Sequence, residues 1–93
     1  MVPIEIDFEK AIEGLKPVTW IYNNDLREIR QIGYIAEEVN KIDSLQYIVV
    51  LDKENKPLGL RYDLLSVYSI EVLKLLSEKI KDLENEVKIL KNK

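Results

Sequence analysis

The side chains that carry most protein chemistry are scarce in this chain. Its 93 residues include no Cys and no His. This excludes disulfides, zinc fingers and His-based metal sites, together with Cys–His and Ser–His–Asp nucleophile systems. Its three Gly form no phosphate-binding loop, so we expect no cofactor and no metal. A chain this short buries only about 60% of its unfolded surface, and a partner chain is the remaining way to add stability.

Charge and hydropathy exclude two further classes of protein. The net charge is −3, from 14 basic and 17 acidic residues, whereas a nucleic-acid-binding protein normally carries a basic stripe. The C-terminal Lys88, Lys91 and Lys93 follow acidic residues and indicate a solvated helix face. The longest apolar run, residues 47–51, is too short for a membrane span. We therefore expect neither a nucleic-acid partner nor a membrane, and the lack of Cys fits a cytosolic origin.

The order of predicted elements divides the chain into two parts within one functional module. Residues 1–63 predict a small mixed head, in which short β-branched or aromatic runs alternate with helical spacing and polar turns. Within it we predict helices over 8–15 and 36–41, and strands over 18–22, 30–35, 45–51 and 57–61. Residues 64–93 contain no Gly or Pro and predict one long helix that begins near Tyr62 or Asp63. The predicted fold class is α+β.

The apolar residues of the long helix follow a heptad spacing. They are separated by 3, 4, 3, 4 and 3 residues, which places them alternately at positions a and d of three heptads. This set, called the seam below, consists of Leu73, Leu76, Ile80, Leu83, Val87 and Leu90. A helix packed only on its own domain usually has a wider apolar stripe. We therefore predict that residues 73–93 form a stalk that associates as a coiled coil with the same helix of other copies of the chain.

Charged residues beside the seam influence whether two such helices associate in a parallel or an antiparallel orientation. In a parallel assembly, Lys79 would face Glu84 of a partner, and Glu86 would face Lys91. Both contacts are attractive, but an antiparallel pair would also bring Lys79 to Glu86. Charge alone therefore favours the parallel orientation only weakly. The competing interpretation of the apolar stripe is an amphipathic helix folded back on its own head.

The long helix changes character on the N-terminal side of Leu73. The same heptad frame places Ser69, Ser66 and Tyr62 at core positions, where they suit a coiled coil poorly. The apolar residues of this part cover nearly all sides of the helix. We therefore predict that this part is buried against the head.

Four segments, taken in this order, resemble the endosialidase-type intramolecular chaperones, which are C-terminal modules of phage tail spikes and fibres. Residues 8–20 are similar to the family's helix, its "L-R-P-V" turn and its aromatic strand. Residues 30–39 are similar to its "Q-x-G-F-I-A-Q-E-V" signature, the most specific of the four. A strand, turn and strand over residues 47–65 and the long helix complete the resemblance. The signature residues carried over are Gln31, Ile32, Gly33, Tyr34, Ala36, Glu38, Val39 and Tyr62.

The physical character of these residues agrees with the signature. Gly33 in mid-strand predicts a close approach of another group to the backbone. Ala36 is small enough for a helix to pack tightly on a strand. Glu38 falls in the first turn of a short helix, where negative charge is favoured. Its ordinary interpretation is a solvated or capping carboxylate, and a contact between subunits is the alternative.

The resemblance implies a function in assembly. Such modules trimerise at the C-terminus of a fibre, align three chains in register and let the upstream β-rich stem fold. The implied partners are two further copies of the chain and the upstream fibre or spike polypeptide. The implied location is a virion tail appendage, or the host cytoplasm during assembly. Intertwined β-fibres fold slowly and aggregate readily because their contacts are highly non-local, which explains the need for a chaperone.

One feature of the family is missing. Its self-cleaving members use a Ser at the new N-terminus and a Lys five residues later, but residues 1–10 contain no Ser. Ser69 and Lys74 have that spacing, yet five residues of helix turn the chain by about 140°, so these side chains point apart. Either the chain starts after such a dyad, or Met1 stands in place of the Ser, or this version never cuts itself. We expect no enzymatic activity from the chain as it stands.

A homodimeric coiled-coil adaptor with no chaperone role is the alternative function. Ile80 and Val87 at position a, with Leu at d, are typical of two-stranded coiled coils. Leu73 at position a is less typical of a dimer. The family resemblance outweighs this preference and implies a parallel trimeric coiled coil formed by the long C-terminal helix.

Overall fold

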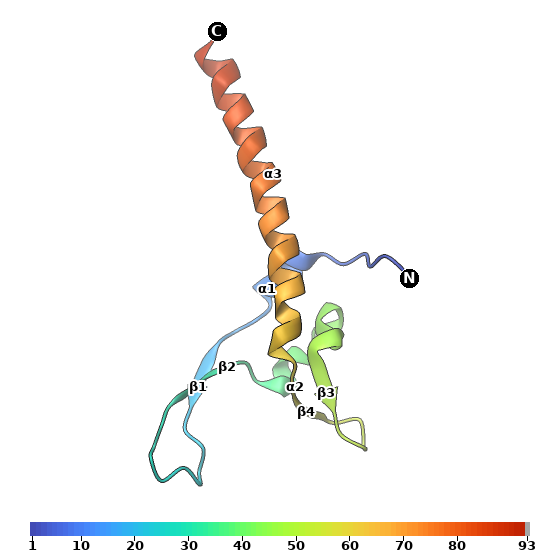
Figure 1. Ribbon diagram of the computed structural model, residues 1–93, viewed down its shortest axis with the longest axis vertical. Helices are drawn as coiled ribbons and strands as arrows, with labels where there is room; N and C mark the ends of the chain where they lie inside the picture. Colours follow the sequence, from blue (N-terminus) through green and yellow to red (C-terminus); the bar gives the residue numbers. More distant parts are fainter. Residues whose placement is uncertain (93) are drawn as a thin grey trace.

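The computed structural model describes residues 1–92 and has the α+β architecture predicted from the sequence, with short elements followed by a single long helix (Figure 1). In chain order the elements are α1 (Phe8–Glu13), β1 (Val18–Trp20), β2 (Gln31–Gly33), α2 (Ala36–Val39), the 3-10 helix η1 (Asp43–Ile48), β3 (Val49–Leu51), β4 (Pro57–Leu60), the 3-10 helix η2 (Tyr62–Leu64) and α3 (Leu65–Lys91). The molecule measures 65 × 38 × 19 Å, because α3 extends well beyond the other elements.

The strands of the head form two separate antiparallel hairpins. In the first hairpin β1 pairs with β2, and Thr19 lies opposite Ile32. This hairpin and its long connecting loop project away from the rest of the head (Figure 1). In the second hairpin β3 pairs with β4, and the register shifts between Val50 and Leu51. Each of these strands is shorter than the sequence predicts, because pairing stops where the chain turns away from its neighbour.

The predicted strand over 45–51 is wrong in its first part. Residues 43–48 form η1, and only the last three residues pair as β3. A 3-10 helix repeats every three residues, so Leu45 and Ile48 lie on the same side, and both are fully buried. The Gln46 side chain also donates a hydrogen bond to the Asn40 carbonyl at 2.7 Å. Packing and this bond override the strand propensity of the segment.

A small core holds α1 and η1 against the first turns of α3. Its buried members are Ala11, Val39, Leu45, Ile48 and Tyr68. The ring of Phe8 meets that of Tyr68 edge-on, with centroids 5.6 Å apart. Tyr68 Oη donates a hydrogen bond to the Ser44 carbonyl at 2.5 Å. The side chain of Asp7 caps α1 by accepting the Lys10 backbone N–H at 3.0 Å.

The long helix begins at Leu65, slightly later than predicted, because η2 forms its first turn. The head covers only one side of it. Tyr68 is 3% exposed, which agrees with the predicted burial of this part of the helix. The same prediction is wrong for Val67 and Ile70, which are 51% and 52% exposed. The head is too small to surround the helix, so it leaves the far sides of its first turns in solvent.

Candidate assembly interface

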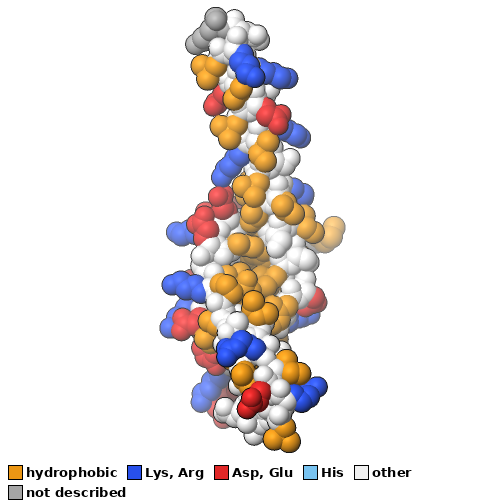
Figure 2. All heavy atoms as spheres, turned by 90° about the vertical axis from the view of Figure 1, so that its left-hand side faces the viewer, with side chains coloured by type: hydrophobic (Ala, Val, Ile, Leu, Met, Phe, Trp, Pro, Cys, Tyr) orange, Lys and Arg blue, Asp and Glu red, His pale blue; other side chains and the backbone are white. Residues whose placement is uncertain are grey.

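The seam residues lie in one row along α3, beginning beside the head and continuing beyond it. Their exposed fractions run from 43% at Leu76 to 67% at Leu90, which is high for large apolar side chains in the middle of a helix. Figure 2 shows hydrophobic side chains following one another along the stalk, between charged ones, and continuing over the upper part of the head. The helix is amphipathic but has no partner for its apolar face within the described residues, 1–92.

The middle of the seam is slightly hollowed. Ile80, Leu83 and Val87 line a shallow apolar depression of about 440 Å³, with Glu84 and Lys88 at its edges. This combination of an apolar floor and a charged rim is the surface that a helix of the same kind can cover, because side chains from one helix fit between four residues of the next.

The structure gives Lys79 a partner within its own chain. Its Nζ lies 2.9 Å from Oε2 of Glu9, on α1, and the two side chains are 57% and 38% exposed. No sequence pattern signals this pair, because the residues are 70 positions apart. The ion pair shows that α1 reaches α3 at the level of Lys79, within the predicted stalk. The other residues expected to form inter-chain pairs, Glu84, Glu86 and Lys91, lie exposed on the stalk.

Three signature residues lie where the first hairpin meets the base of α3, namely Gly33, Tyr34 and Tyr62. Gly33 is the last residue of β2, and a Cβ there would lie 2.5 Å from Tyr62 Oη and 3.0 Å from Cη2 of Trp20. The predicted close approach at Gly33 is therefore present. Tyr62 comes from η2, directly before α3, so the glycine lets the hairpin and the start of the long helix meet.

Tyr62 also forms hydrogen bonds to the backbone of the signature segment. Its Oη accepts the Tyr34 N–H at 3.0 Å and lies 3.4 Å from the Tyr34 carbonyl, to which it donates. The two rings stack with centroids 6.2 Å apart. One side chain thus satisfies both polar groups of a residue that has left the β2 ladder.

The remaining signature residues do not form one site. Val39 enters the core, at 3% exposure, and Ala36 begins α2. Gln31 is half-buried in β2, while Ile32 is 77% exposed on the opposite side of that strand. Glu38 is exposed and forms an ion pair with Lys41, with Nζ and Oε1 3.6 Å apart. The structure therefore gives Glu38 a solvated contact within its own chain.

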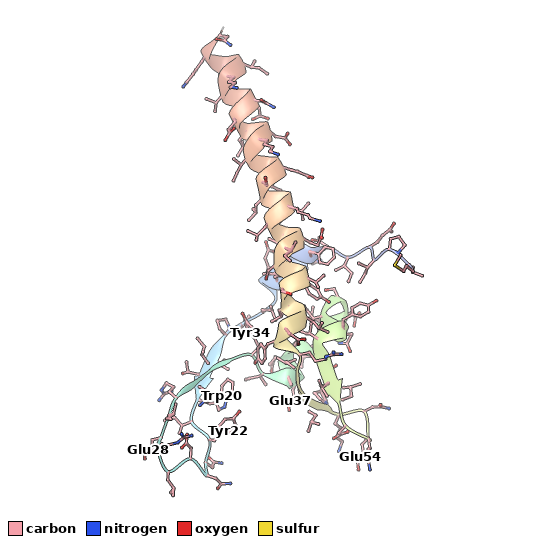
Figure 3. All side chains as sticks on the ribbon, in the orientation of Figure 1. Trp20, Tyr22, Glu28, Tyr34, Glu37 and Glu54 are labelled. Carbon is pink, nitrogen blue, oxygen red and sulfur yellow. The ribbon has the colours of Figure 1, made fainter. Side chains whose placement is uncertain are left out.

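A cleft separates the first hairpin from α2 and β4. It holds about 350 Å³, and its walls include Trp20, Tyr34, Glu37, Leu58 and Tyr62. Figure 3 shows the labelled Trp20, Tyr34 and Glu37 side chains around this space. The sequence indicated Tyr34 and Tyr62 through the signature, but no motif in the sequence pointed to Trp20 or Glu37 as its neighbours.

The most perturbed titratable group lies in the core. Burial raises the pKa of the Tyr68 phenol above its ordinary value, and the nearby Tyr47 adds to the rise. The shift has a structural cause, because the phenol is packed against Phe8 and bonded to Ser44. The group faces the core, so it offers no acid or base to a substrate.

Side-chain clusters suited to other chemistry are not found in the part of the chain that the structure describes. Within residues 1–92, no three His, Cys, Asp or Glu side chains gather closely enough to hold a metal ion. Among the helices of the same residues, none is long and apolar enough to cross a membrane. Ser69 and Lys74 both lie on α3, and Nζ of Lys74 pairs with Oε1 of Glu71 at 3.0 Å.

Comparison with known proteins assigns part of the chain to a protein family. A family model described as chaperone of endosialidase matches residues 2–49, just over half of the 93 residues. The matched segment runs from before α1 through β3's first residue, so it includes the first hairpin and most of the signature. It does not include α3. No curated protein and no solved structure matches the chain.

Proposed function

The chain belongs to the chaperone of endosialidase family, and from this premise we propose that it is the C-terminal trimerisation module of a phage tail fibre or spike. Three copies associate through their stalks and hold three upstream stems in register while the stems fold. The partners are two further copies and the fibre or spike polypeptide. The module acts in the host cytoplasm during assembly, or as part of the tail appendage.

The observation that carries this proposal is the exposed seam. Burying a large apolar side chain stabilises a protein by roughly 1.5–3 kcal/mol, and each stalk presents a continuous row of them to solvent. The head is small, and among residues 1–92 the buried core that it forms with α3 contains only five residues. Covering the seam with other stalks adds apolar burial that the head does not supply on its own.

The ion pair between Lys79 and Glu9 supports a parallel arrangement. In a parallel assembly, Glu86 still faces Lys91 of the neighbour when Lys79 is occupied. The contact with Glu9 competes for Lys79 in both orientations, with Glu84 of a parallel neighbour and with Glu86 of an antiparallel one. The parallel arrangement therefore keeps one of its attractive pairs, whereas the antiparallel arrangement keeps none of those identified in the sequence.

A parallel, in-register stalk suits the chaperone role for a kinetic reason. The stalk is a single local helix that forms quickly, whereas a β-rich stem must close long loops before its contacts form. Joining three chains at one end raises the effective concentration of the three stems for one another. The stems then find each other before they aggregate.

The proposal assigns no peptidase activity to this chain. The family's cleavage chemistry needs a Ser activated by a nearby base, and residues 1–10 contain no Ser. Ser69 and Lys74 do not replace the dyad, since Lys74 pairs with Glu71 and both residues lie within a continuous helix.

A homodimeric coiled-coil adaptor is the second candidate. The observation that favours it is the β-branched character of Ile80 and Val87 at position a, which suits two strands. The two candidates differ in the mass of the assembly and in whether a stem depends on the module.

The functional experiment attaches this chain to the C-terminus of a β-rich fibre stem. Unfolded samples are diluted into buffer, and the yield of native trimeric stem is measured. We expect the yield to fall when the seam is broken by Ile80→Asp together with Leu83→Asp. A yield that is unchanged by this pair of substitutions would favour the adaptor, because the stem would then need no alignment.

A further inference from the structure

The head lies beside the seam, on a particular side of α3. Tyr68, at heptad position c, contacts Phe8 of α1, and Lys79, at position g, pairs with Glu9 of the same helix. Position g borders the seam of a coiled coil. α1 therefore runs along the edge of the surface that we assign to assembly, and it stands close to any helix that covers that surface.

The opposite border of the seam, position e, carries an apolar residue at the height of the head. Ile70 is 52% exposed, although its neighbours at the e positions of the stalk, Ser77 and Glu84, are polar. In a parallel coiled coil, position e of one helix faces position g of the next, five residues earlier. The position g residue that would face Ile70 is Leu65 of the neighbouring helix. Leu65 is partly buried, because it packs against the core of its own head.

We propose that the side of α3 that carries Ile70 is covered by a neighbouring copy, through Leu65 at the start of that copy's α3 and the core of its head, against which Leu65 packs. The interface then continues from the seam into the head instead of ending at Leu73. Ser66 and Ser69, at positions a and d of this region, add little apolar burial, so the contact depends on Ile70 and Leu65. This inference rests on the proposed parallel assembly and adds a specific contact to it.

A second copy is the occupant that the arrangement favours, for two reasons. The surface at Ile70 is continuous with the seam and shares its heptad frame, so helices that pair along the stalk bring it into place without further adjustment. The contact also matches an apolar e residue with an apolar g residue, whereas lower down the stalk the same positions hold opposite charges, Glu86 and Lys91. Apolar residues thus face apolar residues, and charged residues face residues of opposite charge.

Val67 provides a matched control on the same turns of α3. It is 51% exposed, almost the same as Ile70, and it is also β-branched and apolar. It occupies position b, which points away from the seam in a coiled coil. The inference therefore predicts that assembly covers Ile70 and leaves Val67 in solvent, although the isolated chain exposes them equally.

The test uses the reaction of single thiols with a neutral maleimide. The chain contains no Cys, so Ile70→Cys, Val67→Cys and Leu83→Cys each report on one position. In the assembled protein, we expect the Ile70→Cys thiol to react about tenfold more slowly than the Val67→Cys thiol, because a covered thiol is protected. Adding Ile80→Asp should dissociate the chains and make the two rates equal.

The outcomes separate this inference from the proposed function. If the Leu83→Cys thiol is protected but the Ile70→Cys and Val67→Cys thiols react equally fast, the inference is wrong and the stalk assembly stands. If the Leu83→Cys thiol is unprotected and the wild-type chain is monomeric, both are wrong. As a second measurement, Ile70→Lys should raise the concentration of half-dissociation about tenfold, and Val67→Lys should leave it unchanged.

Discussion

The hydroxyl of Tyr62 fills the space beside Gly33 that any larger residue would need. A Cβ at Gly33 would lie 2.5 Å from Tyr62 Oη, which at the same time accepts the Tyr34 N–H at 3.0 Å. Tyr62 belongs to the turn that begins the long helix, and Gly33 ends a strand of the projecting hairpin. The contact therefore fixes the hairpin relative to the base of α3.

Replacing Gly33 with Ala should destabilise the chain. The new methyl group pushes against Tyr62 Oη and Trp20, and moving Tyr62 weakens its hydrogen bond to Tyr34. We expect the free energy of unfolding, measured by urea titration, to fall by about 1–3 kcal/mol. Gly59→Ala is the control, because no heavy atom of the described residues lies within 4 Å of the corresponding position there. A loss at Gly59 as large as that at Gly33 would contradict this account.

A double-mutant cycle with Tyr62→Phe tests whether the hydroxyl is the cause. Tyr62→Phe alone should cost about 0.5–1.5 kcal/mol, because it removes the hydrogen bonds to Tyr34. In the Gly33→Ala background, however, it also removes the clash, so the combined cost should be smaller than the sum of the two single costs. Additive costs would show that the methyl group is accommodated in another way.

Leu83→Asp should dissociate the assembly, whereas Ile89→Asp should not. Both residues lie on the stalk and are almost equally exposed in the single chain, 59% and 60%. Leu83 belongs to the seam, but Ile89 occupies position c, which faces solvent in a coiled coil. Sedimentation velocity of the two variants measures the difference. Dissociation by both substitutions to the same extent would mean that apolar area in general, and not the seam, holds the chains together.

Leu90→Cys tests the parallel orientation. In a parallel stalk, the thiols at this d position meet at the C-terminal end and oxidise to a disulfide between chains. In an antiparallel pair the two Leu90 positions are far apart, and each lies opposite Leu73 instead. We expect Leu90→Cys to form linked chains on its own, as seen by non-reducing electrophoresis. Linkage only in a mixture with Leu73→Cys would contradict the parallel arrangement.

The Tyr68 phenol should make the fold sensitive to alkaline pH. Its pKa is raised in the folded chain by burial and by the nearby Tyr47, while an unfolded Tyr titrates near its ordinary value of about 10. The folded state therefore holds the proton more tightly, and this stability is fully present below about pH 10 and is lost as the pH rises through the folded pKa. Thermal melts across this range should show a smaller alkaline loss in Tyr68→Phe, which lowers stability at neutral pH by about 1 kcal/mol because Ser44 loses its donor. An alkaline loss of the same size in the variant would assign the effect to another group.

The sequence predicted the elements whose signals are local. The long helix follows from a stretch without Gly or Pro, and Pro17 correctly limits α1 to the residues before it. The strand prediction is wrong over 45–48 because Tyr47 and Ile48 favour a strand, whereas the core requires Leu45 and Ile48 on one side. Tertiary packing determines the secondary structure of that segment, and a local sequence pattern does not show which residues the core will bury.

The candidate interface likewise has features that a local sequence pattern predicts and features that depend on contacts between distant residues. Heptad spacing predicted the seam, and the structure leaves its members exposed along α3, because the spacing determines which residues share a helix face. It did not reveal that Glu9 occupies Lys79, since this contact joins residues 70 positions apart. Nor did it show that the head leaves Ile70 exposed, which depends on where a small head sits on a long helix.

The mass of the assembly in solution is the most direct test of the central claim. The chain has a mass of 10.9 kDa, and light scattering at concentrations well above half-dissociation should give about three times that value. The seam variant Leu83→Asp should return the mass to that of one chain, which ties the assembly to the stalk. A wild-type mass of one chain or of two would contradict the trimerisation module proposed here, and a mass of two would favour the dimeric adaptor.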